Sequence, residues 1–260
     1  MMSSPSGASQ YHEVAARLRD AIAAGEYPRG GQLPTEEKLA ERLGVHRVTV
    51  NHALSILRAE GLVYVHRGKG TFVTEIPPIR RNAVLRYSRE ARERSGGRGA
   101  FATEITALGR APRSDVTVSR AVPPSRVAAI LGVSDQDKSC VRRARLMYAD
   151  DTPVQIADSY IPLEIAGGTA IEDTDSGPGG IISRFANLGL AQARITEEID
   201  IRPPSADEAE FLKMSPDQRV YDVTHTGWTA DGRAVEVCLH VMPAHQWRLE
   251  YEWPADQQPS

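Results

Sequence analysis

The sequence predicts an α/β protein of the α+β kind, in which a small domain of three helices and a β-hairpin precedes a larger domain built on an antiparallel sheet. At 260 residues the chain is longer than one compact core usually fills. Apolar residues recur at helical spacing as far as residue 60, β-prone runs dominate beyond Phe101, and an Arg-rich stretch separates the two patterns. We therefore expect domains at residues 10–76 and 99–253, joined by a basic linker at 77–98.

Three amphipathic helices are predicted in the first domain. The first runs from Tyr11 to Ile22. The second begins at Thr35, whose side chain can accept from the exposed amides, and ends at Gly44, which suits a left-handed C-cap. The third runs from His46 to Glu60, and its inward stripe consists of Val50, Ala53, Leu54 and Leu57.

A β-hairpin is predicted directly after the third helix. Two short β-prone runs, residues 62–66 and 71–73, flank a turn that contains two glycines. Pro77 and Pro78 then stop regular structure, and within the linker we expect at most one helix, between Val84 and Arg94.

The second domain is predicted to alternate strands with short helices. Turns at residues 150–153 and 230–233 each join two strands closely enough for antiparallel hairpins. The predicted strands are Asp115 to Ala121, Cys140 to Tyr148, Val154 to Tyr160, Ile195 to Ile201, Val220 to Trp228 and Val235 to Met242. The predicted helices are Ser125 to Leu131, Ile181 to Leu188 and Ser205 to Leu212.

Charge is distributed unevenly along the chain. The formal net charge of −3, taken alone, argues against a nucleic-acid partner. The linker, however, contains only two acidic residues, Glu90 and Glu93. Its seven arginines are Arg80, Arg81, Arg86, Arg89, Arg92, Arg94 and Arg98. A phosphate backbone would attract this run, and an ordinary solvated linker explains it equally well.

Several classes of protein are disfavoured. No apolar run approaches the roughly 20 residues that cross a bilayer, and residues 1–9 lack the basic and apolar regions of a secretory signal, so we expect a cytoplasmic protein without a membrane partner. Cys140 and Cys238 are too few and too far apart for a CxxC metal site or a disulfide framework. The motifs GxSxG, HExxH and the P-loop are missing, so we expect neither an enzyme nor a metal or cofactor.

The polar face of the third helix suits a surface that reads bases. Arg47 and Asn51 lie one turn apart on it, and Arg pairs bidentately with guanine as Asn does with adenine. At the hairpin tip, small glycines allow close approach and cations can meet phosphates. The alternative is an ordinary amphipathic helix, since every such helix has a polar outer face. The DNA-binding candidates are Thr35, His46, Arg47, Thr49, Asn51, His52, Arg67, Gly68, Lys69 and Gly70.

A specific series of residues runs through the same region. It consists of Gly30-Gly31-Gln32-Leu33-Pro34-Thr35-Glu36, Leu39-Ala40, Leu43-Gly44-Val45, Arg47, Thr49-Val50, Ala53-Leu54, Leu57, Glu60-Gly61-Leu62 and Gly68-Lys69-Gly70-Thr71-Phe72-Val73. The series resembles the winged helix-turn-helix of the GntR superfamily of bacterial regulators. The resemblance implies a homodimer on a short palindrome, with Arg47 and Thr49 at the recognition helix and the wing glycines at the groove. His46, Asn51 and Glu37 depart from it, because Ser, a long polar residue and Arg are common there, so the operator sequence cannot be transferred.

Residues 85 to 253 resemble the effector domain of the HutC branch of this superfamily, a UTRA-like domain similar in fold to chorismate lyase. The matching pieces are Arg143-Ala144-Arg145-Leu146, Asp151-Thr152-Pro153-Val154, Ser159-Tyr160-Ile161-Pro162, and Gly232 with Val235-Glu236. The resemblance implies effector contacts, for which the candidates are Tyr87, Ser88, Arg143, Arg145, Gly180, Ile181 and Glu236.

Arg143 and Arg145 alternate along a predicted strand, so their side chains should emerge on the same side. Two guanidiniums that converge on a cavity suit a carboxylate or a phosphate. The alternative is that both pair with Asp158 or Glu236 and only hold the sheet. Relatives that bind phosphorylated sugars often have Ser where Pro178-Gly179-Gly180 stand, which makes a sugar phosphate a poor assumption for this chain.

The sequence therefore predicts a DNA-binding transcription regulator, most simply a repressor. It would bind a palindromic operator as a homodimer, with an affinity set by a small-molecule effector for which the two arginines favour an anion. Two alternatives stay open: an enzyme of lyase-like fold with a DNA-binding appendage, and a repressor without a ligand.

Overall fold

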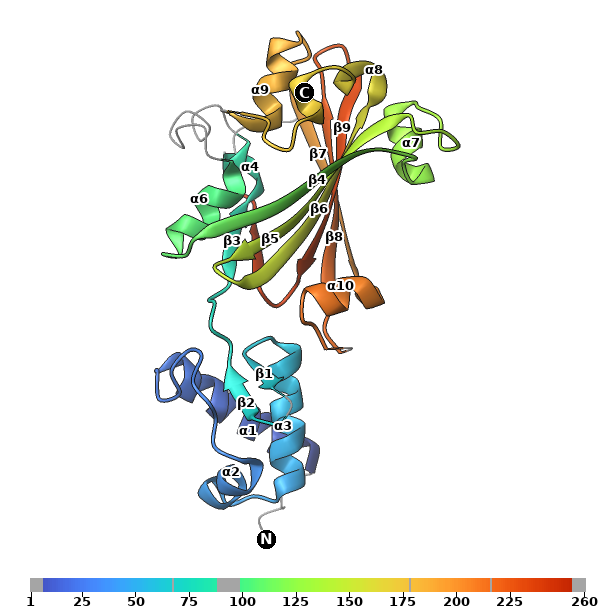
Figure 1. Cartoon of the computed structure of the whole chain (residues 1–260). Helices are drawn as coiled ribbons and strands as arrows, with labels where there is room; N and C mark the ends of the chain where they lie inside the picture. The colour runs from blue at the N-terminus through green and yellow to red at the C-terminus, as the bar shows by residue number, and fades with distance from the viewer. Residues whose placement is uncertain (1–6, 67, 88–98, 178, 216, 254–260) are drawn as a thin grey trace. The chain divides into compact units, whose positions relative to one another are not determined.

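The computed structural model describes residues 7–66, 68–87, 99–177, 179–215 and 217–253, and the chain divides into two compact units (Figure 1). Unit 1 is Met1–Pro78 with Ser215–Gln218, and unit 2 is Ile79–Met214 with Arg219–Ser260. None of the helices in the described ranges combines the length and the apolar character that crossing a bilayer requires.

Unit 1 contains the three helices and the hairpin that the sequence predicts. They are α1 (Gly7–Ala23), α2 (Glu36–Leu43), α3 (Arg47–Ala59), β1 (Val63–His66) and β2 (Gly70–Val73). The Thr35 hydroxyl accepts from the backbone nitrogen of Lys38 at 3.4 Å, and Gly44 ends α2 with a φ of 66°, so both predicted caps are confirmed. Val50 and Leu57 of α3 are fully buried in the core that the helices share with the hairpin.

Unit 2 is built on a six-stranded antiparallel sheet. Its strands are β4 (Pro112–Ala121), β5 (Cys140–Ala149), β6 (Thr152–Pro162), β7 (Arg194–Arg202), β8 (Val220–Trp228) and β9 (Ala234–Pro243). They lie in the order β4-β5-β6-β9-β8-β7. All six predicted strands fall within them, and the two predicted turns join β5 to β6 and β8 to β9 in antiparallel hairpins, as expected.

Short helices cover both faces of this sheet. They are α6 (Ala100–Ala107), α7 (Ser125–Leu131), α8 (Leu163–Ala166), the 3-10 helix η1 (Ala170–Glu172), α9 (Gly180–Asn187) and α10 (Ala206–Phe211). Val141 packs with Phe185 of α9, whereas its neighbour Cys140 faces the other side and packs with Val127 of α7. The three predicted helices correspond to α7, α9 and α10. The sequence did not predict α6, whose N-cap residue, Gly99, offers no side chain to accept from the first backbone amides.

The first residues of unit 2 differ from the prediction of a linker at 77–98. There, β3 (Ile79–Asn82) pairs in parallel with β10 (Trp247–Glu250), and the sequence predicted neither strand. Ile79 and Trp247 are fully buried, and the indole Nε1 of Trp247 donates to the Val154 carbonyl at 2.8 Å. Burial of these side chains fastens the segment to the fold. The predicted helix begins as α4 (Ala83–Arg86), and the rest of that prediction lies outside the described residues.

Two of the three described arginines of this segment do not belong to the solvated or DNA-attracting run that the sequence suggested. Arg81 is fully buried against Glu197, and Arg86 is nearly buried and lies 3.2 Å from Glu104. Arg80 is exposed. Carboxylates on β7 and α6 therefore pair with two of these arginines. The arginines from 89 to 98 lie outside the described residues.

Candidate DNA-binding surface and candidate effector site

A polar face of α3 is exposed on the surface of unit 1. Its opposite face is fixed in the core by Val50, Ala53, Leu54 and Leu57. His46, Arg47, Asn51 and His52 are exposed, and Thr49 is half-buried. The structure therefore brings the candidates of this helix to one surface, with Arg47 and Asn51 one turn apart. Thr35 is engaged as the cap of α2.

Two carboxylates at the start of α2 hold this polar face, which the sequence did not predict. Glu36 accepts from the Nε of Arg47 at 2.8 Å and from the Nδ2 of Asn51 at 3.1 Å. A Glu37 oxygen lies 2.9 Å from Nη1 of Arg47. Hydrogen bonding from Arg47 lowers the pKa of Glu36, and the same bond raises the pKa of Arg47. The pair is therefore fully charged at neutral pH.

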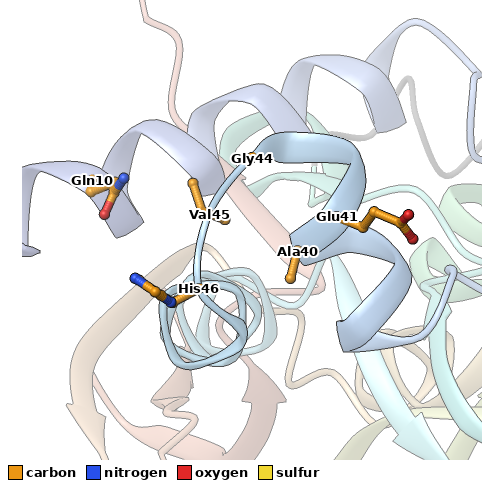
Figure 2. A pocket seen from close by; sticks show the side chains of 6 residues that line it. All are labelled: Gln10, Ala40, Glu41, Gly44, Val45 and His46. Carbon is orange, nitrogen blue, oxygen red and sulfur yellow. The ribbon is translucent and has the colours of Figure 1, made fainter.

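A hollow lies beside the start of α3 (Figure 2). It is lined by Gln10, Ala40, Glu41, Gly44, Val45 and His46. The side chains of Gln10 and His46 lie on the same side of the turn, whereas Glu41 points away from them. The hollow therefore places Gln10 of α1 next to the exposed His46 at the start of α3. Gln10 was not among the predicted contacts, because it precedes the apolar stripe of α1.

The hairpin tip is held by a residue from outside the hairpin. Gly68 and Gly70 have φ values of 77° and 118°, which favour glycine. Gln32 donates to the Lys69 carbonyl at 2.6 Å, and a Cβ on Gly70 would lie 2.7 Å from the Gln32 amide nitrogen. Lys69 is exposed at this tip, whereas Arg67 lies outside the described residues.

Arg47→Ala is expected to weaken binding to a preferred DNA sequence by about ten- to a hundredfold, the value of one good base contact. The reason is that Arg47 stands exposed at the start of α3. Gel-shift titration measures the effect. Arg42→Ala provides the matched control, since Arg42 is an exposed arginine of α2 that pairs with Glu26. Equal affinities for both variants would remove Arg47 from the reading surface.

In unit 2, the register of the sheet gathers several effector candidates on one face. Arg143 of β5 lies opposite Ser159 of β6, which lies opposite Cys238 of β9. Arg145 reaches the same row, because its Nη2 donates to the Ser159 hydroxyl at 2.7 Å and lies 3.1 Å from the Cys238 sulfur. Glu236, buried on β9 two residues before Cys238, accepts from Gln192 at 3.1 Å. Burial raises the pKa of Cys238 to about 11, so this thiol is neutral.

Arg143 is committed to backbone oxygens. It is buried, and it donates to the carbonyls of Ile171 at 2.8 Å, Asp173, and Thr174 at 3.0 Å. Burial and the nearby charge of Arg145 lower its pKa. Arg143 therefore fastens η1 and the segment after it to the sheet.

The alternative pairing that the sequence left open is not the one observed. Asp158 pairs with Arg142, at 2.8 Å, on the other face of the sheet from Arg143. Glu236 takes Gln192 as its hydrogen-bond partner.

Tyr87 belongs to a buried network. Its hydroxyl donates to Glu197 at 3.1 Å and accepts from Arg81 at 3.1 Å, and its ring lies 4.8 Å from that of His225. Burial raises the pKa of Tyr87. Burial would also raise the pKa of Glu197, but the hydrogen bonds from Arg81 and the nearby His225 ring, whose Nδ1 lies 3.4 Å from a Glu197 oxygen, outweigh it and lower that pKa far below its usual value. Ser88, the neighbouring candidate, lies outside the described residues.

The start of α9 is shaped by glycines. Gly179 and Gly180 have φ values of 79° and 63°, and a Cβ on Gly179 would lie 2.0 Å from the Ser183 hydroxyl oxygen. The Ile181 side chain packs against the apolar cluster that contains Phe185. Of these two candidates, Ile181 is thus partly a core residue. Within the described ranges, no group of three or more His, Cys, Asp or Glu side chains is arranged to hold a metal ion.

Comparisons with known proteins agree with this division. Residues 10–73 match the family model of bacterial regulatory proteins of the gntR family, and residues 107–248 match the UTRA domain. An uncharacterised HTH-type transcriptional regulator of Streptomyces coelicolor is 34% identical over 255 residues, covering 95% of this chain and 94% of its own length. The HTH-type transcriptional repressor NagR of Bacillus subtilis is 28% identical, covering 87% of each chain.

Solved structures show the same fold. The crystal structure of a putative GntR-family transcriptional regulator has a TM-score of 0.60 at 25% identity, covering 95% of this chain and 98% of its own. PhnF from Mycobacterium smegmatis has a TM-score of 0.57 at 23% identity, covering 94% of this chain and 100% of its own. As the sequence predicted, the chain belongs to the GntR family and is a DNA-binding transcription regulator with a winged helix-turn-helix and a UTRA effector domain.

Proposed function

We propose that this regulator is a repressor that binds a palindromic operator as a homodimer, with unit 1 on the DNA and a small-molecule effector in unit 2. The observation that carries the DNA-binding part is the exposed pair of Arg47 and Asn51 on one face of α3, since these side chains suit guanine and adenine. The name of the relative NagR supports repression. The protein acts by binding and not by catalysis, and it works in the cytoplasm.

The effector is proposed to bind on the sheet face that carries Arg145. The Nε of Arg145 is buried and has no hydrogen-bond partner among the described residues, which leaves a donor for an anion. Glu236 and its partner Gln192 lie on the same face and supply acceptors for hydroxyl or amine groups. A polar anion therefore fits this face. Arg143 takes little part, because backbone carbonyls already engage its guanidinium.

Selection from a pool of random duplexes by the full chain tests the DNA-binding part. We expect enrichment of a palindrome whose half-sites lie about one helical turn, roughly 34 Å, apart, and light scattering should give the mass of a dimer. Failure of every sequence to be enriched would contradict the proposal, as would a monomer on the selected duplex.

Thermal shift against anionic metabolites tests the effector part, because a ligand that binds the folded state raises its melting temperature. We expect at least one compound to stabilise the protein, to change its operator affinity and to lose both effects in Arg145→Met. Stabilisation that survives in Arg145→Met would place the effector elsewhere.

A further inference from the structure

The side chains of Glu36, Glu37, Arg47 and Asn51 form a cluster. In this cluster the two carboxylates occupy some of the hydrogen-bond donors with which Arg47 and Asn51 would contact bases. An arginine has five N–H donors. Glu36 takes the Nε donor of Arg47, and Glu37 lies against Nη1. The contacts with Glu36 and Glu37 are made through Nε and Nη1, so the donors of Nη2 stay available. These donors can still meet the acceptors of a guanine.

Glu36 also fixes the orientation of the second reading group. The Asn51 amide nitrogen donates to one Glu36 oxygen while Arg47 donates to the other. The remaining hydrogen of that nitrogen and the amide oxygen are the donor and acceptor that adenine requires. One carboxylate, which is only about a quarter exposed at 27%, therefore sets the positions of both groups relative to each other.

Glu37 acts differently, because it is exposed and contacts Arg47 alone in this cluster. A phosphate that meets Arg47 replaces one anionic partner, Glu37, by another, so little electrostatic energy is gained. A guanine is neutral, and its acceptors can meet the donors of Nη2 while Glu37 stays in place. The carboxylate also repels the DNA backbone at every sequence alike.

We propose that Glu36 and Glu37 determine the specificity of DNA binding: Glu36 is a positioning residue for Arg47 and Asn51, and Glu37 competes with phosphates for Arg47. The inference rests on the proposed use of α3 as the recognition helix. It assigns selectivity to acidic residues on α2, outside the helix that reads the bases.

Two DNA probes test the proposal: the duplex enriched from the random pool, and a scrambled duplex of the same composition. Glu37→Gln should raise affinity for the scrambled duplex about threefold to fivefold, in the range of an exposed ion pair, and for the selected duplex less than twofold. Glu41→Gln is the matched control, because it removes the same charge from an exposed position one turn further along α2. It should change both affinities by one common factor.

Glu36→Gln should lower affinity for the selected duplex about tenfold and leave the scrambled duplex within about twofold, since a lost base contact is worth that much. A base-specific measurement separates positioning from mere folding. Replacing the contacted purines by their 7-deaza forms removes the N7 acceptor, so it should weaken binding of the unchanged protein and hardly affect Glu36→Gln. Circular dichroism melting of the full chain checks that each variant is folded.

Specific outcomes would overturn the proposal. If Glu37→Gln changes both affinities by the same factor as Glu41→Gln, Glu37 contributes only general charge. If folded Glu36→Gln keeps its sensitivity to 7-deaza purines, Glu36 does not position the reading groups. Failure of the unchanged protein to select any sequence would instead refute the proposed function itself.

Discussion

Replacing Arg81 with methionine is expected to lower the free energy of unfolding of unit 2 by about 3 to 5 kcal/mol, the usual cost of removing one partner from a buried ion pair. Arg81 is fully buried, and its guanidinium makes two hydrogen bonds to Glu197, one of them at 2.8 Å. Without it, the Glu197 carboxylate stays buried with Tyr87 and His225 as its remaining partners. Urea unfolding followed by tryptophan fluorescence measures the loss, because all three tryptophans lie in unit 2.

Arg80→Met is the matched control for this experiment. Arg80 is the neighbouring residue of β3, and its side chain is 76% exposed, so its loss should cost less than about 0.5 kcal/mol. The double variant Arg81→Met with Glu197→Leu should recover much of the stability, since it leaves no unpaired charge. Equal losses of stability for Arg80→Met and Arg81→Met would mean that the buried pair of Arg81 and Glu197 contributes no more than an exposed arginine.

Acidification gives an independent check on the same pair. Because the folded state lowers the pKa of Glu197 below its ordinary value of 4.5, the stability it contributes is present above that pH and is lost as the pH falls further. In Arg81→Met the unpaired carboxylate is instead relieved by protonation. The difference in stability between the two proteins should therefore shrink on acidification, and a difference that grows would contradict this reasoning.

Arg143→Met is expected to destabilise unit 2 by about 3 kcal/mol, because it leaves buried carbonyls unpaired at roughly 1 to 3 kcal/mol each before the segment relaxes. Arg143 holds the carbonyls of Ile171, Asp173 and Thr174. The same urea titration measures this loss, and limited proteolysis should find new cleavage between η1 and α9. Both effects follow if the residue fastens this segment.

Arg145→Met serves as the comparison on the same strand. The Ser159 hydroxyl and the Cys238 thiol that Arg145 contacts can find other partners more easily than three fixed carbonyls, so its loss should cost about 1 kcal/mol, a typical hydrogen-bond value. If Arg145→Met proved the more destabilising of the two, the roles given to these arginines would have to be exchanged.

Local chemistry made much of the fold predictable from the sequence. Thr35 and Gly44 mark the ends of α2 because capping needs only neighbouring backbone groups. The strands of the large sheet are recognisable as β-prone runs, and the two predicted turns join β5 to β6 and β8 to β9. The parallel pair of β3 and β10 was missed, because its contacts join residues far apart in the chain and no periodicity records them.

The candidate sites were predictable to a lesser degree. The exposure of Arg47 and Asn51 follows from the buried stripe of α3, but their contacts with Glu36 depend on how two helices pack. Alternation placed Arg143 and Arg145 on one face, yet it could not reveal that backbone carbonyls engage the first. Residue type indicates what a side chain can bind, and the tertiary structure decides which partner it meets.

The pairing of β3 with β10 joins the first strand of unit 2 to its last. During synthesis, the helices and hairpin of unit 1 can fold early, whereas β3 can pair only after β10, near residue 250, has left the ribosome. A nonsense mutation ahead of Trp247 would thus release a truncated protein with a complete winged helix and an unfinished effector unit. Such a product would keep the exposed polar face of α3 and lose the sheet face to which the effector is proposed to bind.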